Sequence, residues 1–117
     1  LLIAGTILGA LWADVAWGRF WGWDSKEVAA LITSLVYLVI LHGRYAGLFG
    51  NFGLAVGSVL GATAIISAWY GVNYLFGSGL HSYGTGAGGK LQVGLFMAAN
   101  WVFMAAAAAR YFHETRK

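Results

Sequence analysis

Long apolar runs alternate with short polar or glycine-rich stretches along this chain, and they predict membrane-spanning helices. Residues 1–13 are apolar, but as a helix they reach only about 20 Å. Residues 24–42, 54–76 and 91–109 are each long enough to cross a bilayer core of about 30 Å. The pattern therefore predicts an all-α integral membrane protein, a bundle of one partial and three full transmembrane helices.

Local signals predict where these helices begin and end. Asp24 and Glu27 have the spacing of a capping box, in which each side chain accepts a hydrogen bond from the other residue's backbone. Gly43, beside a cation, predicts that this helix ends near His42. Residues 47–53 are rich in glycine and predict a turn.

Glycines repeat at intervals of four inside the apolar runs. The first run contains Gly5 and Gly9, and the third contains Gly57 and Gly61, with Gly53 just before it. Small residues at this spacing let helices approach closely in lipid, so these glycines predict packing contacts.

The composition excludes an ordinary soluble domain. The chain is 60% hydrophobic and 9% charged, whereas soluble domains carry about 25% charged residues. It contains no cysteine, which excludes disulfides, iron–sulfur ligation and thiolate nucleophiles from this segment. Because the chain begins at Leu1 inside an apolar run, we expect residues 1–117 to be the C-terminal part of a longer membrane protein.

Basic residues fall on two sides of the predicted bundle. One side carries Arg44, Arg110, Arg116 and Lys117; the other carries Arg19, Lys26 and Lys90, offset by Asp14 and Asp24. The positive-inside rule places the first set in the cytoplasm. An aromatic segment (residues 12–27) and a glycine-rich loop with His81 (residues 77–90) then share the outer face.

Four of the six tryptophans lie in the aromatic segment, mixed with glycines and charges. One interpretation is the aromatic belt that membrane proteins form at the interface. The other is a lining for a planar apolar ligand, which the density of rings between Trp17 and Trp23 favours. Arg19 and Lys26 could pair with acidic groups of that ligand, or be solvated interfacial cations.

The three histidines differ in their surroundings. His113 lies in a polar tail and is expected to be solvated. His42 lies at a helix end, where either a functional role or simple snorkelling is plausible. His81 is predicted on the same side as the aromatic segment. A planar apolar ligand together with a histidine indicates heme, whose iron accepts imidazole as an axial ligand.

The aromatic segment resembles a known signature. The run Trp17-Gly18-x-Phe20-Trp21-x-Trp23-Asp24-x-Lys26-Glu27 is similar to the WWD motif of the heme-handling proteins of cytochrome c maturation. Within that superfamily the chain is most similar to the CcsA (ResC) family, including the CcsA half of fused CcsBA proteins. The resemblance continues through residues 30–33, 41–44 and 71–84.

The resemblance implies a role for each matching residue. Those in the external heme-binding segment are Trp17, Trp21, Trp23 and Asp24. His81 matches an external axial ligand of the heme iron, and His42 matches a transmembrane histidine that ligates heme during its passage. The opposite ligands lie upstream and on the CcsB side in the family, so neither site is complete in this chain. Ser25 and Val28 depart from the usual proline and aromatic at those positions.

The implied function is heme transport, followed by covalent attachment of heme to apocytochrome c at the outer face. The implied enzyme is a holocytochrome c synthase working as a CcsB–CcsA complex, with heme b as ligand and substrate. Its partners are CcsB/ResB, an apocytochrome with a C-x-x-C-H motif and the lipid bilayer, but no nucleic acid. The implied location is the bacterial inner membrane or the thylakoid membrane.

Two other classes of function stay open at this point. A heme- or quinol-binding redox subunit would be expected to place paired histidines on facing helices, and here only His42 is near a helix. A purely structural bundle with an aromatic belt would purify without pigment. The segment alone is expected to be inactive.

Overall fold

The computed structural model describes residues 1–72 and 88–116. His81, most of the predicted loop at 77–90, the last residues of the predicted span 54–76, and Lys117 lie outside the described residues. The described chain divides into two compact units, Leu1–Gly86 and Ala87–Lys117.

Every regular element in the described residues is helical. In chain order they are α1 (Leu2–Trp17), α2 (Ser25–Tyr45), α3 (Asn51–Ile66), the π-helix η1 (Ser67–Gly71) and α5 (Lys90–Thr115). Three stretches are long and apolar enough to cross a membrane: Ser25–Tyr45, Asn51–Gly71 and Lys90–Thr115. The helix α1 is shorter, so the predicted class, one partial and three full spans, is confirmed.

The helix α1 runs further than its apolar residues alone predict. It continues past Ala13 to Trp17, and therefore includes the first part of the aromatic segment. Gly18 ends it, with a φ of 69° and its N–H donating to the Asp14 carbonyl at 2.9 Å. This left-handed ending is the usual place for glycine, which has no Cβ to clash there.

The two ends of α2 differ in how well the sequence predicts them. The capping box of Asp24 and Glu27 is present as predicted. The predicted end near His42 is wrong, because α2 continues to Tyr45 with Gly43 inside it. The reason is a contact across the turn, where a Cβ on Gly43 would lie 2.5 Å from Cε1 of Phe49. Gly43 thus makes room for an aromatic ring, and Gly47, with a φ of 73°, makes the turn.

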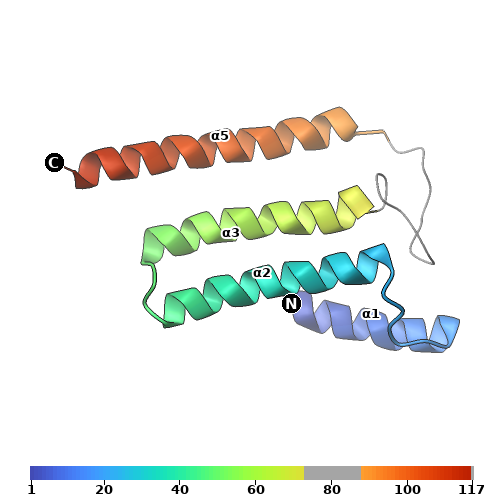
Figure 1. Ribbon diagram of the computed structural model, residues 1–117. Coiled ribbons are helices and arrows are strands. Elements are labelled where there is room, and N and C mark those ends of the chain that lie inside the picture. Colours follow the sequence, from blue (N-terminus) through green and yellow to red (C-terminus); the bar gives the residue numbers. More distant parts are fainter. Residues whose placement is uncertain (73–87, 117) are drawn as a thin grey trace. The chain divides into compact units, whose positions relative to one another are not determined.

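The helices α2 and α3 lie side by side and run in opposite directions (Figure 1). Two of the predicted glycines lie at this contact. A Cβ on Gly57 would be 2.9 Å from Cγ2 of Ile40, and one on Gly61 would be 2.5 Å from Cζ of Tyr37. The prediction of close helix packing is therefore confirmed for these two glycines.

A hydrogen bond also joins α2 to α3. Thr33 is the most buried side chain of the described core, 2% exposed. Its hydroxyl lies 2.8 Å from the Ala29 carbonyl of its own helix and 3.3 Å from the Ala64 carbonyl of α3. In an apolar surrounding such a bond is favoured, because neither group has water as an alternative partner.

Replacing Gly57 by Ala should destabilise the α2–α3 pair. The new methyl must displace Ile40, whose branched side chain has little rotamer freedom in a helix, at a cost of about 1–3 kcal/mol. Gly5→Ala is the matched control, since a Cβ on Gly5 would meet no atom within 4 Å. Unfolding of the full-length protein by SDS in detergent micelles measures both. Equal stabilities of the two variants would show that the close approach at Gly57 is unimportant.

Candidate functional site

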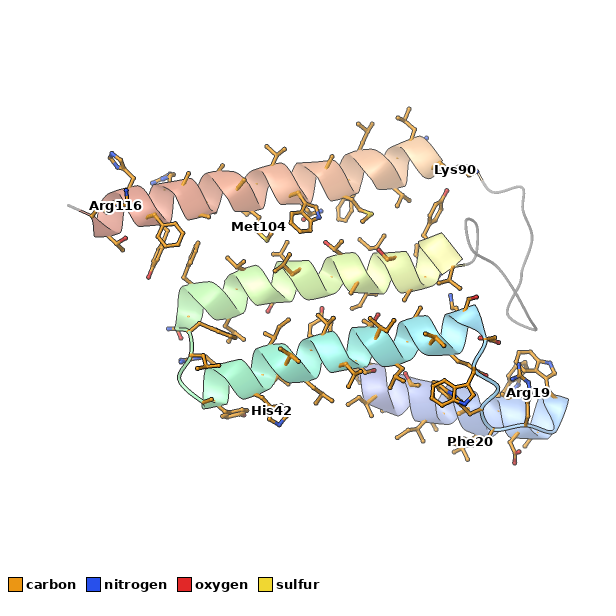
Figure 2. All side chains as sticks on the ribbon, in the orientation of Figure 1. Arg19, Phe20, His42, Lys90, Met104 and Arg116 are labelled. Carbon is orange, nitrogen blue, oxygen red and sulfur yellow. The ribbon has the colours of Figure 1, made fainter. Side chains whose placement is uncertain are left out.

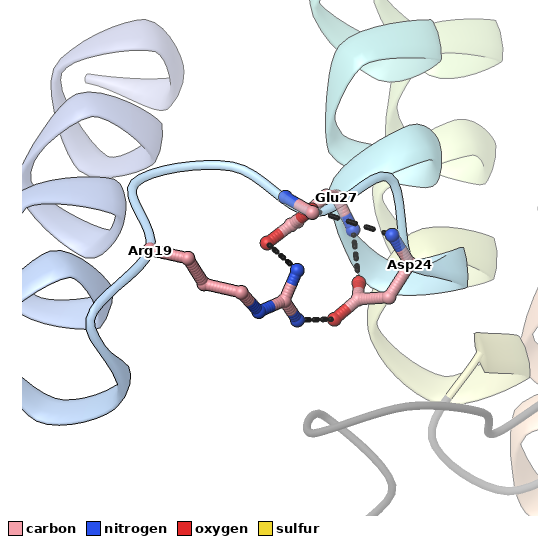
Figure 3. A network of polar contacts seen from close by, with 4 residues as sticks. Arg19, Asp24 and Glu27 are labelled. Atoms are coloured by element: carbon pink, nitrogen blue, oxygen red, sulfur yellow. Dashed lines mark hydrogen bonds and ion pairs between the residues drawn. The ribbon is translucent and has the colours of Figure 1, made fainter.

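The connection between α1 and α2, residues 18–24, is organised by the carboxylate of Glu27 in the first turn of α2. Its Oε2 accepts hydrogen bonds from the backbone N–H of Gly22 at 2.7 Å and of Asp24 at 3.3 Å (Figure 3). The Asp24 carboxylate in turn accepts from the Glu27 N–H at 2.9 Å. Glu27 is buried, with 7% of its surface exposed. A buried carboxylate is stable here because its oxygens are hydrogen-bonded and a cation lies close by.

That cation is Arg19. Its guanidinium lies 3.4 Å from Oδ2 of Asp24 and 3.8 Å from Oε1 of Glu27 (Figure 3). A Cβ on Gly22 would fall on the guanidinium itself. The absence of a side chain at position 22 is therefore what lets Arg19 reach both carboxylates.

The backbone of Trp23 is strained. Its φ of 58° is the one positive value among the non-glycine residues of the described chain. A bulky residue in this left-handed region is a marked exception, and strain of this kind concentrates at functional sites. The Trp23 residue is 69% exposed. Its ring meets Trp21 edge to face, with centroids 5.7 Å apart and planes at 86°.

A groove of about 450 Å³ lies between α1 and α2, beside this connection. Its lining includes Gly5, Gly9 and Ala13 of α1, Phe20 and Trp21 of the connection, and Lys26 of α2. The indole Nε1 of Trp21 is buried, and it has no hydrogen-bond partner among the described residues. The groove is thus mostly apolar with a few polar groups, the usual composition of a small-molecule site.

The predicted site residues fall into three places. Trp21 and Lys26 line the groove. Arg19, Asp24 and Trp23 lie next to it in the connection. Trp17 is the last residue of α1, where its ring meets that of Trp12 edge to face at 5.1 Å.

Lys26 connects the start of α2 to the end of the α3–η1 span. Its Nζ donates to the Trp69 carbonyl at 3.3 Å. Trp69 lies in η1, where the wider π-helical turn replaces the α-helical one. Such turns are frequent at functional sites. The start of α2 and the end of this span are therefore held together at one end of the α2–α3 pair.

His42 lies far from this group. Figure 2 shows it near the end of α2 that is remote from Arg19 and Phe20, and the helix between Asp24 and His42 extends about 27 Å. The ring is exposed, and its Nδ1 lies 2.7 Å from the Leu38 carbonyl. A carbonyl only accepts, so this hydrogen bond requires the proton on Nδ1. In the neutral ring Nε2 then carries the lone pair that a metal needs.

Some of these features were not predicted as parts of a site. Glu27 was predicted as a helix cap within the aromatic motif and also lines the groove, and Gly5 and Gly9 were predicted as a packing face. In the structure both glycines line the groove, and a Cβ on either would meet no atom within 4 Å. Phe20 could have been predicted as a site residue, because it lies within the aromatic motif.

The sequence that forms this site also matches a known family. The sequence model of one family, described as "Cytochrome C assembly protein", matches residues 1–81. The chain belongs to this family. The matched range contains the whole aromatic segment, the groove and His42, and it ends at His81. The helix α5 lies beyond it.

Curated relatives give the same result. The chain is 46% identical over 84 residues to cytochrome c biogenesis protein CcsA of Prochlorococcus marinus (strain MIT 9303). The aligned residues make up 72% of this chain and 26% of that protein. Identity to CcsA of Synechococcus sp. (strain WH7803) is 48%, with the same coverage. For CcsA of Guillardia theta it is 46%, over 72% of this chain and 28% of the relative.

The resemblance to CcsA proteins is thus confirmed, and the chain spans about a quarter of their length. No solved structure matches it.

The strain at Trp23 can be measured by two substitutions. Trp23→Gly should be more stable than Trp23→Ala by about 0.5–1 kcal/mol, because both lose the indole but only alanine keeps a Cβ that disfavours a positive φ. At Phe20, where φ is not positive, the order of the Gly and Ala variants should reverse. SDS unfolding of the full-length variants gives the four stabilities. If the Gly and Ala variants had the same order of stability at both positions, the backbone of Trp23 would not be strained.

Proposed function

We propose that this chain supplies part of the heme-handling surface of a CcsA-type protein that works in cytochrome c biogenesis. The observation that carries the proposal is the aromatic-lined groove at the family's WWD motif, with Trp21 and Lys26 in its lining. The chain is a membrane protein with three helices long enough to span. Because it covers about a quarter of its relatives, the activity as a whole belongs to the longer protein.

The residues present fit a heme. The groove volume of about 450 Å³ lies within the usual range for ligand pockets, about 300–1,000 Å³. Phe20 and Trp21 offer apolar rings to a flat macrocycle, and the Trp21 Nε1 is a buried donor still without an acceptor in the described chain. The acidic side groups of heme suit such a donor and a cation. Lys26 lines the groove, and Arg19, with 30% of its side chain exposed, can face a second carboxylate.

The remaining predicted residues take supporting roles in the proposal. Trp23 extends the aromatic surface beyond the groove, and Asp24 holds Arg19 in place at 3.4 Å. Trp17, paired with Trp12 at the end of α1, forms the edge of the same surface.

Two histidines are the proposed ligands of the iron. His81 is the axial ligand at the outer face, and the opposite ligand comes from the longer protein. His42 is a ligand for heme on its way across the membrane. The bond from its Nδ1 to the Leu38 carbonyl supports this role, because metal-ligating histidines almost always donate their other ring N–H to such an acceptor.

The chain itself contributes positioning to the proposed reaction. Each thiol of an apocytochrome C-x-x-C-H motif adds across a vinyl group, with sulfur bonding one carbon and hydrogen the other, so no oxidant is consumed. The thiols come from the substrate, since this chain has no cysteine. Holding the macrocycle with its vinyl edge outward converts the encounter into an oriented one, which is a large part of what such a site provides.

The proposed setting completes the model of function. CcsB/ResB, fused or separate, is the partner, and the connection at 18–24 faces the periplasm or the thylakoid lumen. The membrane is then the bacterial inner membrane or the thylakoid membrane.

Substitution of His81 by Ala in the full-length protein, purified with its partner, tests the proposed function. Loss of a ligand should lower the heme content by about tenfold or more, since even groups that merely orient a ligand contribute about 10- to 100-fold in metal affinity. Any heme that remains should become sensitive to added imidazole. The pyridine hemochrome assay and the Soret spectrum provide the measurements.

His113→Ala is the matched control, because His113 is exposed in the last turn of α5 and has no proposed role. Unchanged heme content, spectrum and imidazole resistance in His81→Ala would refute the ligand assignment.

A further inference from the structure

We propose that Glu27 is a positioning residue for heme, which acts by holding Trp23 in its left-handed conformation and so presenting the Trp23 indole. This inference rests on the proposed function and deepens it. The starting observation is that the amides on both sides of Trp23, those of Gly22 and Asp24, donate to the same oxygen of Glu27.

The convergence of these two amides explains the strained backbone. Neighbouring N–H groups point at one anion when the residues between them combine right- and left-handed conformations. The φ of 58° at Trp23 turns the Gly22 and Asp24 amides toward Oε2 of Glu27. Without this acceptor the two amides lose the hydrogen bonds that compensate the strain, and the backbone relaxes to the extended region that a tryptophan prefers.

Packing constrains the Trp23 indole through few contacts. The residue is 69% exposed, and the ring meets Trp21 by an edge. The backbone therefore sets the direction of the Cα–Cβ bond, and with it the rotamers that the indole can adopt, and the backbone depends on Glu27. A change of φ from left-handed to extended would carry the indole away from its place beside the groove.

The role of Glu27 goes beyond the capping box. Within the box, Oε2 accepts from the Asp24 N–H at 3.3 Å, whereas the bond from Gly22, outside the box, is shorter at 2.7 Å. Arg19 adds a contact to the other oxygen of Glu27. The shorter of the two backbone bonds to Glu27 is thus made outside the capping box.

Two conservative substitutions separate this role from simple charge. Glu27→Gln keeps a carbonyl oxygen at the right reach for both amides but loses the charge that faces Arg19. Glu27→Asp keeps the charge and is acceptable in a first helical turn, but it is one methylene too short for the Gly22 amide. The proposal predicts that Glu27→Gln keeps most of its heme. Glu27→Asp should lose as much heme as Trp23→Ala does.

The experiment uses the full-length protein purified with its partner and its own heme. Heme content and the imidazole concentration that perturbs the Soret band are measured for Glu27→Asp, Glu27→Gln, Trp23→Ala and the double variant Trp23→Ala/Glu27→Asp. Because Glu27 acts through Trp23, the double variant should lose no more heme than Trp23→Ala alone. Glu114→Ala is the matched control, a glutamate paired with Arg110 at 3.3 Å on an exposed face.

Two results of the heme measurements would overturn the inference. One is the reverse order, with Asp retaining heme and Gln losing it, which would show that only the charge matters. The other concerns the double variant. If the fraction of heme that it retains is the product of the fractions retained by the two single variants, the two residues act independently.

A readout without heme distinguishes failure of the inference from failure of the proposed function. In protein labelled with 5-fluorotryptophan, the Trp23 resonance is assigned by its disappearance in Trp23→Phe. It should move in Glu27→Asp and stay in Glu27→Gln. If it moves while heme content is unaffected by Trp23→Ala, the proposed heme role of Trp23 fails and the positioning stands. If it stays in both, the positioning itself is refuted.

Discussion

The organisation of the site depends on one buried carboxylate. Glu27 caps α2, receives the amides on both sides of Trp23, and attracts the guanidinium of Arg19. These contacts convert a short glycine-containing connection into a defined shape, in which the groove lining and the exposed indole lie next to each other. A loop of this length without such a centre would sample many conformations, and ordering each residue would cost about 1–2 kcal/mol.

The α2–α3 pair provides the rigid base for this connection. In lipid, helices associate through close packing and interhelical hydrogen bonds rather than through the hydrophobic effect. Gly57 and Gly61 allow the close packing, and Thr33 supplies the interhelical hydrogen bond to the Ala64 carbonyl. Since the pair is antiparallel, the start of α2 and the η1 end of its neighbour are brought together, and the Lys26 contact with Trp69 uses this proximity.

The parts that could be predicted from the sequence are those with local causes. The capping box depends on residues three positions apart, and the spans depend on their own composition. The end of α2 could not be predicted, since it depends on the Phe49 ring covering Gly43 from beyond the turn. Likewise, nothing local marks Gly22 as the place for the Arg19 guanidinium or Trp23 as left-handed. Those features depend on the side chains of Arg19 and Glu27 folding back onto the connection, which their spacing alone does not predict.

The π-helix η1 has a consequence for reading the chain beyond it. Its hydrogen bonds skip one residue more than those of an α-helix, so it inserts one extra residue into the turn. Each residue of an α-helix advances the side-chain direction by about 100°. Val72, which follows Gly71, is therefore offset by about this angle from the face that α3 would assign to it. A helical wheel drawn in register with Asn51–Ile66 therefore places Val72 on the wrong face, and deleting one residue within Ser67–Gly71 would undo the offset.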